Sequence, residues 1–266
     1  MDMYTLKQIP SETQVRKYLK RAIFGGKYPF CPQCHKTNPV VYEDRYRCRR
    51  CRAKFSLTSH TWLANCKLPL QQWWMLLWCW TTQIPVKQTE ALTHLSEKAV
   101  RHWYEQFRLH LPEEYHVLET IVQLDEAYFK NWCLMAAKQV GSRKLAYELI
   151  YQNHPDKTHA ARFLFDKVQP GSKLWTDGSK IYSGISSQWP VEHSRDIHKR
   201  FEFEHTSEIE AVFANLRTFI RRMYHHVTPD KFPDYVREFC FRFSTPEIFQ
   251  SPLLYAEKTL ILVPTG

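Results

Sequence analysis

Four cysteines near the N-terminus restrict the fold of this chain more than any other feature. Cys31 and Cys34 form one Cys-x-x-Cys pair, and Cys48 and Cys51 form a second pair after 13 intervening residues. Two such knuckles joined by a hairpin can place four thiolates tetrahedrally around a zinc ion. Because the segment holds little apolar mass, metal binding would supply much of its folding free energy. We predict a structural Zn²⁺ site here, against the alternative of a chance pairing of reduced cysteines.

Basic side chains crowd the second cysteine pair, next to a hairpin expected at residues 40–42 and 45–47. The six are Arg45, Arg47, Arg49, Arg50, Arg52 and Lys54. They form either a solvated face that offsets the charge of the thiolates or a set of contacts to phosphates, and the two interpretations are compatible. We select Arg49, Arg50, Arg52 and Lys54 as candidate DNA contacts.

Composition favours a polyanionic partner. The chain has 266 residues, a net charge of +10 and a pI near 9.2, which indicates nucleic acid before membrane. The longest unbroken apolar run, residues 73–80, is far shorter than the roughly 18 residues that a membrane span requires. The N-terminal residues lack the apolar core of a signal peptide. We therefore expect a cytoplasmic protein without a membrane partner, in which cysteines are thiols and metal ligands.

Helical periodicity dominates the segment that follows the cysteines. Residues 70–82 are apolar nearly all round, which predicts a buried helix whose tryptophans belong to the core. A second helix is expected at 86–95, and Ser96 is a good N-cap for a third that runs to about Leu111. Its expected apolar stripe comprises Ala99, Val100, Trp103, Phe107 and Leu111.

The outer face of the third helix carries Lys98, Arg101 and Arg108. Two helices joined by a turn, with basic residues on the second, are typical of a helix-turn-helix that places its last helix in the major groove of DNA. The same periodicity also fits a plain helical bundle. The position directly behind a zinc ribbon favours the DNA reader, and these three residues are its candidate contacts.

From residue 120 the pattern changes from helices to strands. Three runs predict an antiparallel meander, and they are residues 120–129, 133–140 and 144–151. A helix follows at 159–168, and a fourth strand at 173–176 should return parallel to the first through a crossover. This order predicts a ribonuclease-H-like α/β domain with a mixed sheet, in which the first and fourth strands are neighbours.

Carboxylates interrupt these strands where burial is expected. Asp125 and Glu126 lie in the first strand, and Asp177 follows the fourth. A buried carboxylate requires an arginine, a proton or a metal ion as its partner. Side chains alternate along a strand, so Asp125 and Glu126 should point to opposite faces and only one should reach the metal. We select Asp125, with Glu126 as the second choice.

A later helix supplies the third acid. Its buried stripe is expected at Ile209, Val212, Phe213, Leu216, Ile220 and Met223. Glu210, Arg217 and Arg221 lie along one flank of this stripe, and Glu208 lies on the other. This fits a groove where a carboxylate holds metal while arginines hold DNA phosphates. The spacing alone equally fits an exposed face that only aids solubility.

Six motifs follow the ribbon and the helices in a fixed order. They are VQLDEAYF, LWTDGSKIY, PVEHS, HTSEIEAVF, MYHHV and FCFRF. From about residue 15 to 244 the chain resembles DDE-type insertion-sequence transposases, whose catalytic domain is called ISXO2-like. The resemblance implies an acidic triad of Asp125, Asp177 and Glu210, followed by Arg217 where the family usually has lysine.

Further matches and departures accompany this resemblance. His193, Tyr224, His225 and His226 match family positions for which the residues themselves indicate no role. The family commonly has asparagine at Ser207, tryptophan at Phe213 or Ala214, and Asn-Arg-Arg after Phe243. Residues 246–266 match no family feature.

The resemblance also implies an activity. Such a protein binds double-stranded DNA at element ends and target, acts as a homo-oligomer on DNA in a bacterial-type nucleoid, and cleaves and transfers strands with Mg²⁺ or Mn²⁺. Two such ions roughly 3.5 to 4 Å apart activate the nucleophile and hold the leaving oxygen. The alternative is an inactive transposase-derived DNA-binding protein, although the presence of all three acids favours the enzyme. A zinc hydrolase is disfavoured because no His-Glu-x-x-His motif occurs.

The expected organisation is therefore α+β and multidomain. It comprises an N-terminal basic helix at 1–27, the zinc ribbon at 28–57, the helix-turn-helix region at 58–114, the ribonuclease-H-like DDE domain at 118–245 and a divergent tail at 246–266.

Overall fold

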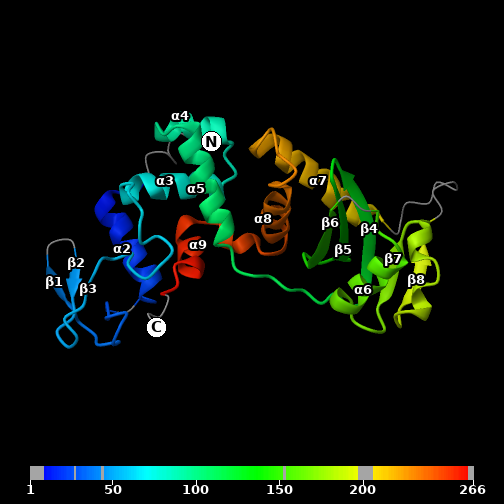
Figure 1. The fold of residues 1–266 in the computed structure, drawn as a ribbon, viewed down its shortest axis with the longest axis horizontal. Coiled ribbons are helices and arrows are strands. Elements are labelled where there is room, and N and C mark those ends of the chain that lie inside the picture. The colour runs from blue at the N-terminus through cyan, green and yellow to red at the C-terminus, as the bar shows by residue number, and fades with distance from the viewer. Residues whose placement is uncertain (1–8, 27, 43–44, 152–153, 197–205, 263–266) are drawn as a thin grey trace. The chain divides into compact units, whose positions relative to one another are not determined.

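The computed structural model describes residues 9–26, 28–42, 45–151, 154–196 and 206–262 (Figure 1). The chain forms two compact units. Met1–Pro112 and Glu247–Gly266 together form one, here called the ribbon unit, and Glu113–Pro246 forms the other, here called the sheet unit. Along the sequence, the sheet unit is therefore inserted into the ribbon unit.

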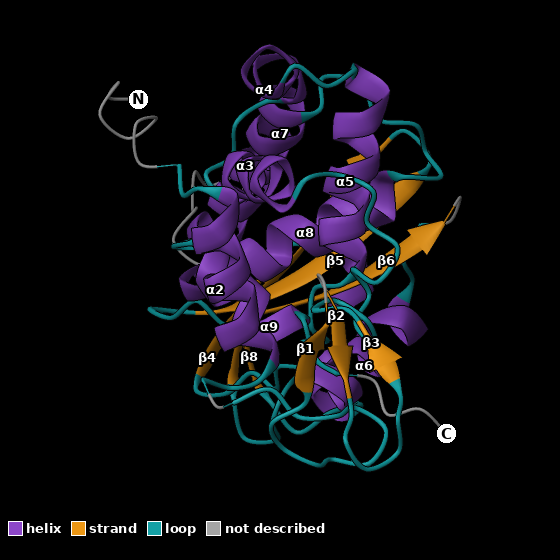
Figure 2. Ribbon diagram, turned by 90° about the vertical axis from the view of Figure 1, so that its left-hand side faces the viewer, coloured by secondary structure: helices purple, strands orange, loops and turns teal. Residues whose placement is uncertain are grey.

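The ribbon unit contains a small antiparallel sheet of three strands (Figure 2). Strands β1 (Val40–Tyr42) and β2 (Arg45–Arg47) form the predicted hairpin. Strand β3 (Lys54–Phe55) pairs with β2, and Phe55 stacks on Tyr46 with ring centroids 5.3 Å apart. A strand of two residues carries no readable periodicity, so the sequence pattern does not indicate β3.

The helices of the ribbon unit that precede the sheet unit in the sequence contribute to its core. They are α2 (Glu12–Ile23), α3 (Leu70–Thr81), α4 (Val86–Thr93) and α5 (Glu97–Leu109). Helix α2 begins at a reciprocal capping box between Ser11 and Gln14. On α3, Trp73 and Trp80 are fully buried, and both pack on Phe107 of α5, at 5.9 and 5.5 Å between ring centroids. The prediction that the tryptophans of α3 serve the core is confirmed for these two.

The face that α5 buries differs from the predicted one. Tyr104 is fully buried, and its hydroxyl lies 2.9 Å from the carbonyl oxygen of Ile84, to which it donates. Trp103 is only half-buried. The buried stripe of α5 is therefore rotated by about one residue from the predicted stripe, and Arg108 is left only 5% exposed. The prediction that Arg108 faces outward is therefore wrong.

The other two basic residues of α5 lie on its outer side. Lys98 is exposed, and Arg101 forms an ion pair of 2.8 Å with Glu97, one helical turn earlier. The three consecutive helices occur where the sequence predicts them, and their use as a DNA reader stays a prediction.

The divergent tail completes the core of the ribbon unit. After the short helix η4 (Pro246–Phe249), helix α9 (Pro252–Thr259) packs on α2 and α3 (Figure 1). Tyr255 of α9 is fully buried, with its ring 5.3 Å from that of Trp80 and its hydroxyl 2.7 Å from the carbonyl oxygen of Phe107. The last four residues of the tail, 263–266, lie outside the described residues.

The sheet unit has five strands in the order β6-β5-β4-β7-β8. Their bounds are β4 Ile121–Phe129, β5 Trp132–Gln139, β6 Leu145–Tyr151, β7 Lys173–Thr176 and β8 Glu192–Arg195. Strands β4, β5 and β6 form an antiparallel meander, and β7 runs parallel to β4, as predicted. Strand β8 joins β7 in parallel and, being short and polar, is not indicated by periodicity. This is the mixed sheet of a ribonuclease-H-like fold, and the predicted fold class is confirmed.

Helices cover both faces of this sheet. Helix α6 (Lys157–Lys167) and the short helices η1 (Lys180–Tyr182) and η2 (Ile185–Ser187) share one core with Val122 and Leu124 of β4.

The helices α7 (Ser207–Met223) and α8 (Phe232–Ser244) contact β4 to β6 (Figure 2). The stripe on α7 is as predicted except that Phe219 is buried and Ile220 only half-buried. None of the described helices is long and apolar enough to cross a bilayer.

We predict that Tyr255→Ala destabilises the ribbon unit by about 3 to 5 kcal/mol, because it leaves a cavity beside Trp80 and deletes a buried hydrogen bond. Urea unfolding followed by tryptophan fluorescence measures this. Leu254→Ala on the same helix, where the side chain is 37% exposed, is the control and should cost far less. Equal stabilities of the two variants would show that the tail does not belong to the core.

Candidate functional site

The four cysteines of the ribbon converge on one point. The sulfur of Cys31 lies 3.5 Å from that of Cys51, and the sulfur of Cys34 lies 3.5 Å from that of Cys48. All four lie within 4.8 Å of one another. A tetrahedral zinc ion with Zn–S bonds of about 2.3 Å needs sulfur atoms about 3.8 Å apart. The cluster therefore fits a structural Zn²⁺ ion, as predicted.

Each knuckle is closed by its own backbone. The amide of Cys31 donates to the carbonyl of Lys36 at 2.9 Å, and the amide of Cys48 donates to that of Ala53 at the same distance. His35 and Arg52 adopt the left-handed conformation, with φ of 55° and 65°. The six basic residues around the second knuckle are all exposed.

Three carboxylates gather in the sheet unit, where β7 ends beside β4. Asp125, Glu126 and Asp177 each offer an oxygen within 4.8 Å of the others. The parallel pairing of β4 with β7 ends at Leu124 and Thr176, so the next residue of each strand is an acid. Adjacent strands thus place Asp125 beside Asp177, as the crossover topology predicts.

Glu126 corrects one expectation from the sequence. The carboxylate of Glu126 accepts a hydrogen bond from the hydroxyl of Tyr182, which belongs to the core on the α6 side of the sheet. Asp125 instead faces α7. The two side chains do leave the strand on opposite faces. The expectation that only one of them can reach the metal is nevertheless wrong in its geometry, because both side chains offer an oxygen within 4.8 Å of one on Asp177, which follows the end of β7 at Thr176.

Asp177 is held by its local turn. Its carboxylate accepts the amide hydrogen of Ser179 at 3.0 Å. A Cβ added at Gly178 would lie 3.2 Å from the carbonyl oxygen of Asp196, so the chain passes closely here. The preceding Thr176 is fully buried, and its hydroxyl lies 2.9 Å from Nε2 of His193. His193 therefore supports the strand end that carries Asp177.

Glu210 stands on the first turn of α7, outside the group of three. It is exposed, and one of its oxygens accepts the hydroxyl of Thr206 at 3.1 Å. Its negative charge is close enough to contribute to the raised pKa of Asp125, after burial and the two nearer acids. The structure thus brings Asp125 and Asp177 together and leaves Glu210 at the border of the same cluster.

The helix carrying Glu210 is fixed to β4 by a buried amide. Gln123 is 1% exposed, and its side-chain oxygen accepts the backbone amides of Glu208 and Ile209, at 2.9 and 3.0 Å. Lys138, opposite Gln123 on β5, forms an ion pair with Glu208. Gln123 therefore acts as a cap for α7. Sequence reasoning missed both residues, although a glutamine and a lysine inside apolar strands are visible signals.

The acidic cluster lacks a charged partner. Burial, together with the charges of Glu126, Asp177 and Glu210, raises the pKa of Asp125 to about 7, against the amide hydrogen bond from Glu126. Within the described residues, no ion pair joins Asp125, Glu126 or Asp177 to a cation. Mg²⁺ and Mn²⁺ prefer such carboxylate oxygens, so the donor set fits a hard divalent cation.

The other candidate residues of α7 lie along its exposed side. The guanidinium of Arg217 lies 5.3 Å from the ring centre of Phe129 at the end of β4, and Arg221 is exposed. His225 and His226 are exposed, whereas Tyr224 is buried and donates to Glu238 at 2.6 Å. Tyr224 is thus a core residue.

Two family models match this chain. The ISXO2-like transposase domain matches residues 129–244, and the transposase zinc-ribbon domain matches residues 10–54. No curated protein matches it.

Two solved structures show low similarity. One is the intasome of simian T-cell lymphotropic virus in complex with PP2A regulatory subunit B56 gamma, with a TM-score of 0.35 and 12% identity over 63% of this chain and 67% of that one. The other is the HTLV-2 integrase catalytic core domain in complex with magnesium, with a TM-score of 0.33 and 11% identity over 48% of this chain and 87% of that one.

We predict that Cys48→Ser lowers zinc content from about one ion per chain towards zero and unfolds the ribbon, because the segment depends on the metal for stability. Elemental analysis and limited proteolysis after Arg45 or Arg47 measure this. Cys79→Ser, which changes a buried thiol away from the cluster, should keep the zinc. Full zinc content in Cys48→Ser would contradict the assignment.

We also predict that Mn²⁺ binding at the acidic cluster weakens about tenfold for each pH unit below about 7, because the ion must displace the proton held by Asp125. Calorimetry in buffers of different ionisation enthalpy measures affinity and proton release together. Above pH 7 the affinity should level off, since Asp125 is already ionised. An affinity that is unchanged across that pKa would contradict the prediction.

Proposed function

We propose that this chain, which belongs to the DDE-type insertion-sequence transposases with a zinc ribbon and an ISXO2-like domain, binds the terminal inverted repeats of its element and catalyses Mg²⁺-dependent strand cleavage and transfer. The observation that carries the proposal is the convergence of Asp125 and Asp177, beside Glu126 and Glu210, without a cationic partner among the described residues. Such a cluster is costly unless an ion neutralises it.

The acids have distinct positions in this proposal. Asp125 and Asp177 hold the metal, Glu210 completes the site from α7, and Glu126 is a fourth carboxylate oriented by Tyr182. The bound ions would polarise the scissile phosphate and lower the pKa of an attacking water or 3′-hydroxyl. Gln123 and Lys138 are positioning residues, since they hold the helix that carries Glu210.

Double-stranded DNA, both element ends and target, is the proposed partner, and the chain would act on it as a homo-oligomer. The candidate contacts on the ribbon are Arg49, Arg50, Arg52 and Lys54, all exposed. Further candidate contacts are Lys98 and Arg101 on α5, and Arg217 and Arg221 on α7. Arg108 has no such role in the proposal because it is buried.

A second candidate is an inactive, transposase-derived DNA-binding protein. It would keep the zinc ribbon and the exposed basic residues but not the chemistry. The clustered carboxylates favour the enzyme, because a protein that only binds DNA gains nothing from half-buried acids that repel phosphate.

We predict that Asp125→Asn reduces Mg²⁺-dependent nicking of a duplex carrying the element's terminal repeats by on the order of 10³-fold or more, while the dissociation constant for that duplex stays within about threefold. A nicking assay and a gel shift on the same preparation measure the two. Glu192→Gln, an exposed acid of β8, is the control and should keep both. Loss of binding together with cleavage would contradict the proposal, and binding without nicking by the unmodified chain would favour the inactive form.

A further inference from the structure

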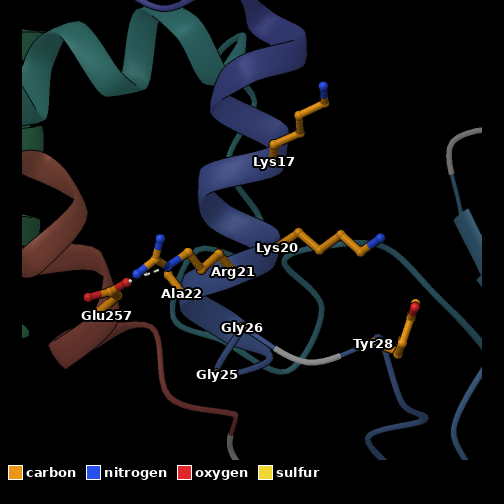
Figure 3. Close-up of a pocket in the computed structure, with 8 residues that line it drawn as sticks. All are labelled: Lys17, Lys20, Arg21, Ala22, Gly25, Gly26, Tyr28 and Glu257. Carbon is orange, nitrogen blue, oxygen red and sulfur yellow. Dashed lines mark ion pairs between the residues drawn. The ribbon is translucent and has the colours of Figure 1, made fainter.

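A basic groove of about 1040 Å³ lies within the ribbon unit, between α2 and the chain that leads to the first cysteine. Lys17, Lys20, Arg21 and Tyr28 line it together with Glu257 of α9. Figure 3 shows Lys17 and Lys20 extending from the side of α2 that faces Tyr28, while Arg21 extends towards Glu257. The groove is separate from the zinc site and from the acidic cluster.

The groove's two lysines carry uncompensated charge. Arg21 pairs with Glu257 at 3.4 Å, whereas neither Lys17 nor Lys20 has an ion-pair partner within the described residues. They are three residues apart on α2 and are therefore neighbours on its surface. The opposite face of α2 is buried through Val15, Leu19 and Ile23, so packing fixes the direction in which the lysines extend.

Two glycines form the end of the groove. Gly25 and Gly26 follow the end of α2 with φ of 61° and 75°, a conformation that side chains disfavour. Tyr28 lies on the side of α2 towards which Lys20 extends, and 77% of its surface is exposed (Figure 3). The exposed phenol and the two ammonium groups without ion-pair partners among the described residues are three donor groups for an anionic ligand.

The basic surface continues from α2 to the ribbon. Arg16 on α2 is near enough to Tyr46 on β2 for its positive charge to lower the pKa of that tyrosine, against the larger rise caused by burial. Arg45 and Arg47, on either side of Tyr46, are exposed. Basic side chains thus extend from the groove along α2 towards β2, with Arg16 paired to Glu12 at 3.6 Å, and a series of this length suits an extended polyanion better than a small anion.

We propose that this groove holds the sugar-phosphate backbone of duplex DNA, with Lys17 and Lys20 each neutralising one phosphate and the hydroxyl of Tyr28 donating to a phosphate oxygen. The assignment rests on the proposed function and adds to it a binding segment on the N-terminal helix. Glu257 limits the affinity, because its carboxylate neutralises Arg21 and repels phosphate.

The test uses the full zinc-loaded chain and a fluorescein-labelled duplex of arbitrary sequence, titrated by anisotropy over a series of salt concentrations. Lys17→Ala/Lys20→Ala should weaken binding about tenfold and reduce the slope of log K against log salt by about 1.8, because about 0.9 is lost for each phosphate contact. Tyr28→Phe should weaken binding by a smaller factor and leave the slope unchanged, since it removes a donor without removing charge.

Glu257→Gln supplies a change of opposite sign. It removes a negative charge and frees Arg21, so binding should tighten and the salt slope should increase by up to about 0.9. Lys258→Ala, which removes an exposed lysine of α9 outside the groove, controls for net charge and should change the slope little. Zinc content and thermal unfolding of each variant show that its fold is retained.

The outcomes separate this inference from the proposed function. A double lysine variant that binds like Lys258→Ala overturns the groove assignment while the unmodified chain still binds DNA. Absence of duplex binding by the unmodified chain overturns the proposed function itself. Competition by inorganic phosphate at equal ionic strength, with no change of duplex affinity in the lysine variants, would identify a small-anion site and also overturn the assignment.

Discussion

The position of Glu210 relative to the acidic cluster depends on one buried amide. Gln123 accepts the backbone amides of Glu208 and Ile209, two of the donors that the start of a helix leaves without an intrahelical partner. A buried donor without a partner costs about 1 to 3 kcal/mol, so α7 is held to β4 at this point. The ion pair of Lys138 with Glu208 fixes a second point. Glu210 therefore has a defined place relative to Asp125, two residues after Gln123 on the same strand.

The two candidate metal sites of this protein differ in donor chemistry. Thiolates in the ribbon suit zinc, and carboxylates at the end of β7 suit Mg²⁺ or Mn²⁺, so the two sites should not exchange ions. The zinc site contributes to folding. The acidic cluster opposes folding, because burial and the neighbouring carboxylates raise the pKa of Asp125 to about 7. Proteins keep such destabilising groups where function requires them.

The tail packs against the N-terminal helices, so the ribbon unit is built from residues on both sides of the sheet unit in the sequence. Tyr255 packs against both Trp80 and Phe107, and Glu257 pairs with Arg21 of α2. Both of the chain segments that flank the sheet unit in the sequence therefore belong to the ribbon unit. A tail that resembles nothing in sequence can still be required, because packing needs only apolar residues of suitable volume.

The sequence by itself determined the zinc ribbon, the meander, the crossover to β7 and the pairing of Asp125 with Asp177, because cysteine spacing and strand periodicity are local properties. It could not determine the exact rotation of α5, since burial of Tyr104 and Arg108 instead of Trp103 depends on which neighbours they meet. Only the tertiary structure decided that Glu126 joins the cluster, that Gln123 caps α7 and that α9 packs on α2. Each of these depends on contacts between segments that are far apart in the sequence, and no local pattern carries that information.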